Sequence, residues 1–287
     1  MGVSVRVRSH QLNKFMTTTS HENSTRKRLV IRISRHSLAM AVQDIDDLSV
    51  PLAYTPYTIK GTMSITANLR EAMKTLEIFS RDYTKVMVMV DTPQLVVPLD
   101  VNKESDSTLL YTHCYPDTGN SIVKDDIIGD INVAVLYSIP KDIHTVISDR
   151  YPSATFFNAS TPVWHYLFKR SFSGGRKKLY AYFHDQSMEI FGYGQNRFRF
   201  CNTFTLDNSH DALYFILNVW KQQSMDEQKD EFHFVGEVPE QQWLETELKG
   251  YIKNVYFINP VTDFNRSPIA QIPSLPYDMM TYFIKGR

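Results

Sequence analysis

The chain has 287 residues, of which 31 are basic and 31 are acidic, so its formal net charge is zero. This balance argues against a dedicated nucleic-acid or membrane binder, because both usually leave a basic footprint. The eleven glycines make up about 4 % of the chain, against roughly 7 % in an average protein. A chain with few glycines has few positions where backbone N–H groups can closely surround a phosphate group. The length favours two domains.

The N-terminal segment carries the only strong charge asymmetry. Residues 1–36 hold eight basic residues and one acid, Glu22. We expect residues 1–27 to form a disordered basic tail, with Met16 as an alternative start. The arm around Arg26 to Arg35 offers a possible RNA contact, although it lacks the interleaved aromatic residues that single-stranded nucleic acid favours. A solubilising tail is the simpler interpretation.

Targeting signals and disulfide patterns are missing from the sequence. No apolar run reaches the length of a membrane-spanning helix, and the start has no apolar block of the signal-peptide type. Cys114 and Cys201 are too few for a disulfide framework, and we expect both to be reduced thiols. The prediction is a cytoplasmic protein without membrane contact.

Hydrophobic patterning in the first half predicts alternating strands and helices. Residues 28–34 and 38–42 are β-branched and apolar, and the turn at 35–37 separates them. Further strands are predicted at 52–59, 85–90, 131–139 and 154–157. Helices are predicted at 65–81, at 141–150 behind Pro140, and from Thr161 onward.

The second half repeats this order. Strands are predicted at 178–183, 187–193 and 197–205, a helix at 209–223 with Ser209 as its cap, a strand at 232–235, a helix at 239–250 and a strand at 254–258. Corresponding elements lie about 150 residues apart. The polar stretch 171–178 separates the halves. Beyond Pro260 the chain is punctuated by prolines before a closing helix around 278–284.

The predicted order is two tandem units, each with three strands followed by alternating helices and strands. This order resembles the actin, sugar kinase and Hsp70 superfamily. The spacing of the elements is most similar to that in the pilus- and division-associated actin-like proteins. The text Leu29-Val-Ile-Arg-Ile-Ser and Leu38-Ala-Met-Ala-Val also resembles a family of uncharacterised Bacteroidetes proteins, domain of unknown function 3822. The resemblance implies an α/β fold of two ribonuclease-H-like, actin-like ATPase units, each a mixed five-stranded sheet flanked by helices. They would span 28–172 and 173–287, the second with a Pro-rich C-terminal extension.

The resemblance also implies where a nucleotide would bind, namely between the two units. Each unit's first hairpin would supply a glycine-rich turn with an aspartate, and a glycine pair would face adenosine. The corresponding positions here are Ser34, Arg35, His36 and Ser37, then Asp185, Gln186 and Ser187, then Gly236 and Glu237. The first turn has neither Asp nor Gly, the second has one Asp, and the third has one glycine. Side chains with a Cβ at these turns hinder the approach of backbone N–H groups to phosphate.

Other chemistry-bearing patterns are weak. The nine histidines lack metal-ligand spacing, so no metal site and no cofactor are predicted. Two acidic groups lack the spacing of a calcium loop: Asp44, Asp46 and Asp47, and Asp125, Asp126 and Asp130. Tyr180 and Tyr182 would either be covered or form an aromatic surface between the units.

These observations favour a non-catalytic actin-like protein that binds or scaffolds a protein partner. One alternative is an ATPase or kinase with atypical phosphate loops, in which Asp185 positions the metal and Gly236 faces the base. A second alternative is an RNA-associated factor that acts through the basic N-terminal arm.

Overall fold

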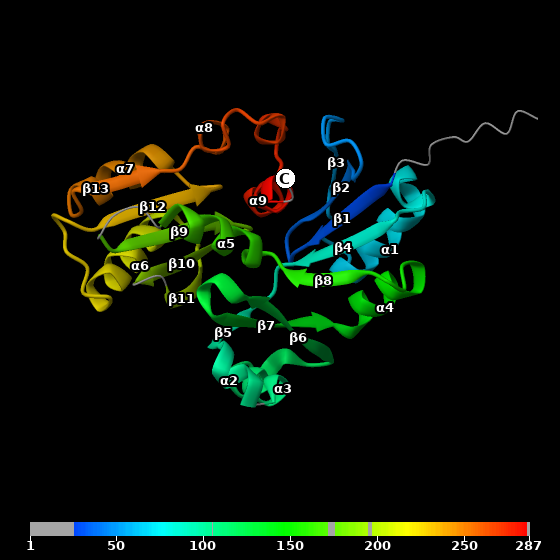
Figure 1. The fold of residues 1–287 in the computed structure, drawn as a ribbon, viewed down its shortest axis with the longest axis horizontal. Helices are drawn as coiled ribbons and strands as arrows, with labels where there is room; N and C mark the ends of the chain where they lie inside the picture. The colour runs from blue at the N-terminus through cyan, green and yellow to red at the C-terminus, as the bar shows by residue number, and fades with distance from the viewer. Residues whose placement is uncertain (1–25, 105, 172–175, 195–196, 286–287) are drawn as a thin grey trace, which may run out of the picture.

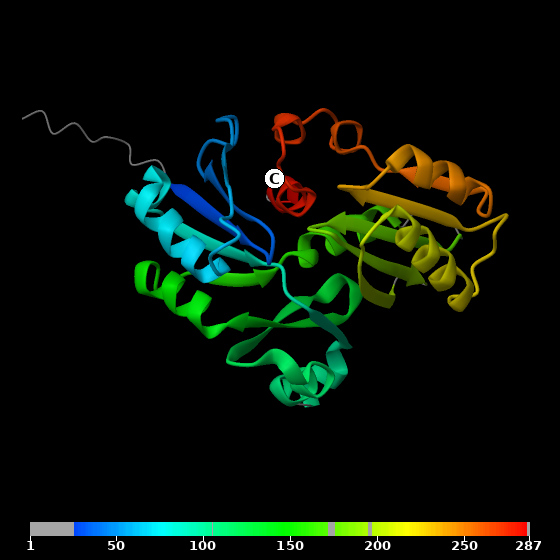
Figure 2. The ribbon, with the colours of Figure 1, turned by 180° about the vertical axis from the view of Figure 1, so that it is seen from behind.

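Two five-stranded sheets stand side by side, with helices on their outer faces and with two helices, α5 (Ser160–Ser171) and α9 (Tyr277–Lys285), between them (Figures 1 and 2). The computed structural model describes residues 26–104, 106–171, 176–194 and 197–285. The predicted tail lies outside this part of the chain, apart from its last two residues. Residues 172–175 of the polar stretch that separates the halves, which include Gly174 and Gly175, also lie outside it. No helix in the described part is long and apolar enough to cross a membrane.

The first sheet has the strand order β3-β2-β1-β4-β8. Its strands are β1 Lys27–Ile33, β2 Leu38–Asp44, β3 Ala53–Tyr57, β4 Lys85–Val90 and β8 Thr155–Asn158. The first three are antiparallel neighbours, and β4 and β8 extend the sheet in parallel with β1. Nearly every residue of β1, β2 and β4 is buried, because helices or chain segments cover both faces.

The second sheet repeats the first with the order β11-β10-β9-β12-β13. Its strands are β9 Lys178–His184, β10 Ser187–Gly194, β11 Arg197–Thr205, β12 Glu231–Gly236 and β13 Asn254–Phe257. The two antiparallel pairings and two parallel pairings occur in the same positions as in the first sheet. The predicted α/β fold with two mixed five-stranded sheets is confirmed.

A third sheet interrupts the first unit between β4 and β8. Its order is β5-β7-β6, with β5 Gln94–Pro98, β6 Ser121–Ile128 and β7 Val133–Pro140, and it carries α2 Leu99–Glu104 and α3 Ser107–Cys114. The sequence predicts only one strand of this sheet, 131–139, which is β7, and does not predict the sheet itself. The insertion also breaks the predicted constant offset, because β8 begins at residue 155 and β13 at residue 254, about 100 residues apart.

The outer helices follow the predicted apolar stripes, with two corrections. Helix α1 (Ile65–Thr75) ends six residues before the predicted end at residue 81, because Leu76 is extended and a short 3₁₀ helix, η1 (Glu77–Ser80), follows. Helix α6 (Ser209–Gln222) is capped by Asn208 rather than Ser209. The Asn208 side chain accepts from the backbone N–H groups of His210 and Asp211, and Asp211 completes a capping box. Helices α4 (Lys141–Arg150) and α7 (Gln241–Lys249) lie near their predicted positions.

The C-terminal extension returns across the top of the molecule and ends between the two sheets (Figures 1 and 2). It contains α8 (Pro260–Asp263), the 3₁₀ helix η4 (Pro268–Gln271) and α9 (Tyr277–Lys285). Helix α9 packs against α5 (Ser160–Ser171) inside one apolar core that both sheets share. Tyr180 and Tyr182 are buried in this core, so they do not form an exposed aromatic surface.

Candidate functional site: an ionic plug and a polar pocket between the sheets

The β1–β2 turn is closed by its own side chains. The Ser34 hydroxyl accepts from the backbone N–H groups of His36 and Ser37, at 3.1 and 2.8 Å. The Ser34 N–H donates to the Ser37 carbonyl at 2.9 Å. These backbone donors are the groups that a phosphate-binding turn would present to its ligand. In this chain they are already satisfied within the turn.

The β9–β10 turn has two residues, Asp185 and Gln186, both with positive φ angles of 44° and 62°. This backbone matches the tight hairpin turn that suits the twist of the flanking strands. The turn directs the Asp185 carboxylate toward the first sheet. It therefore faces the β1–β2 turn across the space between the units, as the resemblance implied.

Arg32 occupies the space between these two turns. It is the next-to-last residue of β1, beside the turn, and is 1 % exposed. Its guanidinium donates to Asp185 at 2.7 Å, to Asp278 at 2.8 Å and to the Ser37 hydroxyl at 2.5 Å. Burial alone would lower the pKa of Arg32, but the carboxylates of Asp278 and Asp185 raise it well above its usual value. The group is therefore a fixed positive charge, and we call Arg32, Asp185 and Asp278 the ionic plug.

Asp278 brings the C-terminal helix into the plug. It lies in α9, is completely buried, and also accepts from the Tyr182 hydroxyl at 3.0 Å. Burial raises the pKa of this carboxyl, and Arg32 opposes that shift. A buried carboxylate without its cation would be very costly. Arg32 therefore joins the first sheet, the second sheet and α9 in one charge-paired contact.

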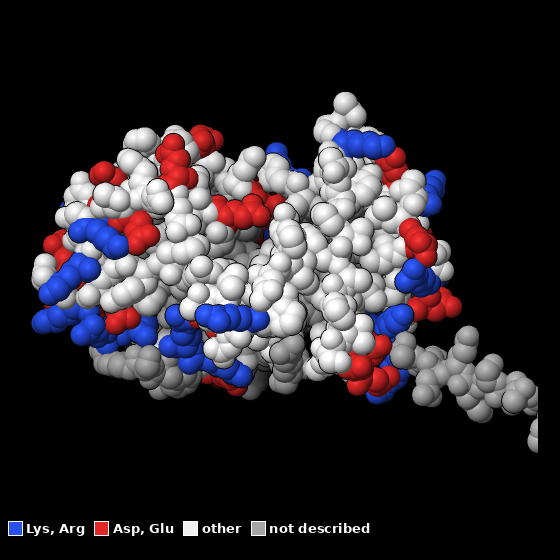
Figure 3. All heavy atoms as spheres, turned by 90° about the horizontal axis from the view of Figure 1, so that it is seen from above, with Lys and Arg blue, Asp and Glu red and all other residues white. Residues whose placement is uncertain are grey.

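A polar pocket of about 420 Å³ lies beside the plug. Five of the predicted cleft residues line it: Arg35, His36, Asp185, Gln186 and Ser187. Ser34, Ser37, Gly236 and Glu237 do not line it. Figure 3 shows a different face, seen from above, where a narrow hollow separates the two halves of the molecule and several Asp and Glu side chains lie beside it.

Gly236 has a structural reason to be glycine. Its φ angle is 101°, and a Cβ built there would lie 2.0 Å from the Phe183 carbonyl oxygen. The next residue, Glu237, donates its N–H to that same oxygen at 3.0 Å. The close approach of β12 to β9 therefore accounts for the glycine without an adenosine contact.

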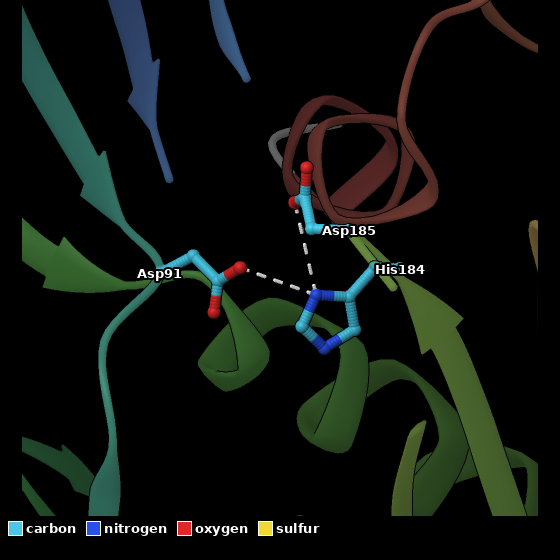
Figure 4. Close-up of side chains that lie close together, drawn as sticks. All are labelled: Asp91, His184 and Asp185. Carbon is cyan, nitrogen blue, oxygen red and sulfur yellow. Dashed lines mark ion pairs between the residues drawn. The ribbon is translucent and has the colours of Figure 1, made fainter. Parts of the chain in front are cut away.

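A cluster of ionisable groups lies at the wall of the pocket (Figure 4). The His184 Nδ1 lies 3.2 Å from Asp91 and 3.8 Å from Asp185, while its Nε2 lies 3.3 Å from Glu189. Asp91 follows β4 in the first unit, whereas the other three belong to the β9–β10 hairpin. Burial would lower the pKa of His184, but Asp91, Asp185 and Glu189 raise it well above its usual value. The cluster strongly favours positive charge at this position.

The Glu189 carboxylate accepts hydrogen bonds from side chains of α5 and β5. It accepts from the Ser160 hydroxyl, from the Trp164 indole N–H at 3.2 Å and from the Gln94 amide at 2.9 Å. It is 1 % exposed. Three neutral donors and the nearby imidazole therefore compensate the buried charge.

Sequence reasoning missed four residues of this region: Arg32, Asp91, Glu189 and Asp278. Arg32 and Glu189 each interrupt an otherwise apolar strand, and that signal was available. A charged residue in a strand buried on both faces must find an opposite charge or several hydrogen-bond partners. Asp91 and Asp278 carry no comparable local signal, because only the fold brings them to the cleft.

The remaining predicted acidic groups serve local structure. Asp44 accepts from the backbone N–H groups of Asp46 and Asp47, and Asp46 pairs with Arg26 at 2.6 Å. Asp130 lies 2.8 Å from His165.

Asp126 belongs to β6 rather than to a loop. It accepts from the Asn158 N–H and the Thr161 hydroxyl, both at 2.7 Å. Burial raises the pKa of Asp126 to about 6.

The fold and the paired hairpin turns define a member of the actin-like ATPase fold class. One similar solved structure is a Bacteroides thetaiotaomicron protein described as having an actin-like ATPase fold and unknown function. It is 26 % identical, with a TM-score of 0.79 over 91 % of this chain and 96 % of that chain. The PilM–PilN type IV pilus biogenesis complex is also similar in fold, at 12 % identity and a TM-score of 0.52 over 90 % and 98 % of the two chains.

The family model described as "Protein of unknown function (DUF3822)" matches residues 16–255. The chain therefore belongs to the DUF3822 family. No curated protein matches the sequence.

Proposed function

We propose that this chain is an actin-like protein that has given up nucleotide hydrolysis and serves as a binding or scaffolding protein. The ionic plug is the observation that carries the proposal. Arg32 pairs with Asp185, the one aspartate that the phosphate turns retain, and Ser34 takes the backbone donors of the other turn. Phosphoryl transfer depends on groups that are free to face the phosphates. Here Arg32 fills the space between the two turns, and the backbone donors of the first turn bond to Ser34.

A phosphate-release assay with magnesium and ATP, run on the full chain and on Asp185→Asn, tests this proposal. We expect no release above background for either protein. Turnover by the full chain that Asp185→Asn abolishes would instead establish the ATPase or kinase alternative. The RNA alternative has less support, because two basic residues of the N-terminal arm already have other roles. Arg26 pairs with Asp46, and Arg32 is buried.

The open edge of β11 favours a protein partner. This nine-residue strand ends its sheet, so in the described part of the chain it pairs only with β10. It contains no proline, whereas the edge strand of the first sheet contains Pro56. An unblocked edge strand can pair with a strand of another protein.

A photo-reactive residue at Asn202 in β11 tests this surface, with Tyr214 in α6 as a control position that is also exposed. We expect a defined cross-linked partner from position 202 in cells that make the protein, and none from position 214. Equal labelling from both positions would contradict the assignment of this edge.

A further inference from the structure

We propose that Asp91, His184 and Asp185 form a binding site for a divalent transition-metal ion such as Zn²⁺. The three side chains each offer a ligand atom, and these atoms all lie within 4.8 Å of one another. Figure 4 shows the His184 ring between the two carboxylates, with its Nδ1 facing both. A ring nitrogen with two carboxylate oxygens is a common ligand set for zinc.

The two separations from His184 are close to those of a tetrahedral ion. Zinc binds nitrogen and oxygen ligands at about 2.0–2.2 Å, so two ligand atoms of a tetrahedral site lie about 3.4 Å apart. The separations from His184 Nδ1 are 3.2 Å to Asp91 and 3.8 Å to Asp185. An ion can therefore enter with small side-chain shifts. All three residues line the polar pocket, which leaves the fourth ligand position open to water or a bound group.

The state of His184 is the independent observation that points to a ligand. The residue is 6 % exposed, yet neither ring nitrogen makes a hydrogen bond. Buried polar atoms are rarely left without a partner. The ring nitrogens face the carboxylates of Asp91, Asp185 and Glu189 at ion-pair distances of 3.2–3.8 Å. A metal ion bound between Nδ1 and the two aspartates would replace the proton of the charged ring and give Nδ1 a directed bond.

The surrounding groups resemble the supporting contacts of established metal sites. A histidine that binds metal usually directs its other ring nitrogen toward a carboxylate, which fixes the ring. Here Nε2 lies 3.3 Å from Glu189, whose carboxylate is itself anchored by Trp164 and Gln94. Arg32 likewise anchors Asp185. Glu189 is therefore a positioning residue and not a ligand.

The charge of the pocket fits a divalent cation. Asp91, Asp185 and Glu189 bring three carboxylates around His184, and Arg32 pairs with only one of them. The ion would also tie the two units together, because Asp91 comes from the first sheet and the hairpin from the second. The inference is independent of the proposed function, since a chain without nucleotide chemistry can still hold a metal.

Titration of the metal-stripped full chain with Co²⁺ and Zn²⁺ tests the proposal. We expect the visible absorption of four-coordinate Co²⁺, displacement of that signal by Zn²⁺, and a higher melting temperature with either ion. His184→Gln and Asp91→Asn should each abolish the signal, while Glu189→Gln should weaken binding about 10–100-fold. His36→Gln is the matched control, because His36 lines the same pocket outside the cluster.

Several results would overturn the proposal. They are the absence of a Co²⁺ signal in the full chain, unchanged binding by His184→Gln or Asp91→Asn when both are folded by circular dichroism, and loss of binding in His36→Gln. Binding of Mg²⁺ that requires ATP, with no binding of Co²⁺ or Zn²⁺, would also overturn the proposal. That result would in addition contradict the proposed function. If His184→Gln does not fold, Asp91→Asn decides the outcome, because that carboxylate is partly exposed.

Discussion

At the scale of single residues, the arrangement of Arg32 shows how the cleft between the units is closed. One guanidinium satisfies two carboxylates and a hydroxyl that belong to three different parts of the fold. Breaking a buried ion pair on one side costs far more than removing both partners, because it leaves an uncompensated charge.

We therefore predict that Arg32→Met lowers the free energy of unfolding by about 3–5 kcal/mol. The double variant Arg32→Met with Asp278→Asn should recover part of this loss, since it no longer buries a lone carboxylate beside methionine. Urea unfolding of the three proteins measures both effects. Arg81→Met is the control, because its ion pair with Glu77 is exposed and should contribute little. Equal losses in the single and double variants would contradict the charge-pairing account.

Asp126 provides a pH-dependent test at the same scale. Burial places its pKa near 6 in the folded state, above the ordinary value of 3.8. The folded state thus binds the proton more tightly than the unfolded state, so this group's contribution is fully favourable below about pH 4 and is lost as the pH rises to 6. A shift of about two units corresponds to about 3 kcal/mol.

Asp126→Asn cannot ionise and should remove that dependence. We expect the free energy of unfolding of the parent chain, relative to the variant, to fall between pH 4 and pH 6 and then level off. Urea unfolding at several pH values measures the difference. Parallel curves for the two proteins would show that Asp126 does not titrate with this shift.

At the scale of elements, the sequence predicted the start of α6 to within one residue but assigned its cap to Ser209 instead of Asn208. The stripe of apolar residues located the helix, but both Asn208 and Ser209 are residue types that cap helices. The structure selects Asn208, since its side chain accepts from the backbone N–H groups of the second and third residues of α6, His210 and Asp211. The Ser209 hydroxyl bonds to Glu240 instead.

We predict that Asn208→Ala destabilises the protein by about 1 kcal/mol. Asn218→Ala makes the same substitution at an exposed position inside the same helix, where alanine is the better helix former. That control should leave stability unchanged or slightly higher. Thermal unfolding of both variants gives the comparison, and equal destabilisation would rule out a capping role.

At the scale of the whole molecule, the repeated order of strands and helices predicted two similar units, and the resemblance to a known superfamily implied that each contains a mixed five-stranded sheet. Both sheets are present and have the same strand order. The inserted third sheet was not found, because β6 alternates weakly and places charged Lys124 and Asp125 in mid-strand. For the cleft, local patterns located both hairpin turns and the missing glycines. They could not reveal the plug, since Arg32 and Asp278 are 246 residues apart in the chain.

The central claim is that protein side chains, rather than a nucleotide, now occupy the contacts between the two units. Isothermal titration calorimetry of the full chain with magnesium and ATP tests this most directly. The account predicts no heat beyond dilution, both for the full chain and for a chain carrying Asp185→Asn. Saturable binding in the micromolar range that Asp185→Asn removes would contradict it.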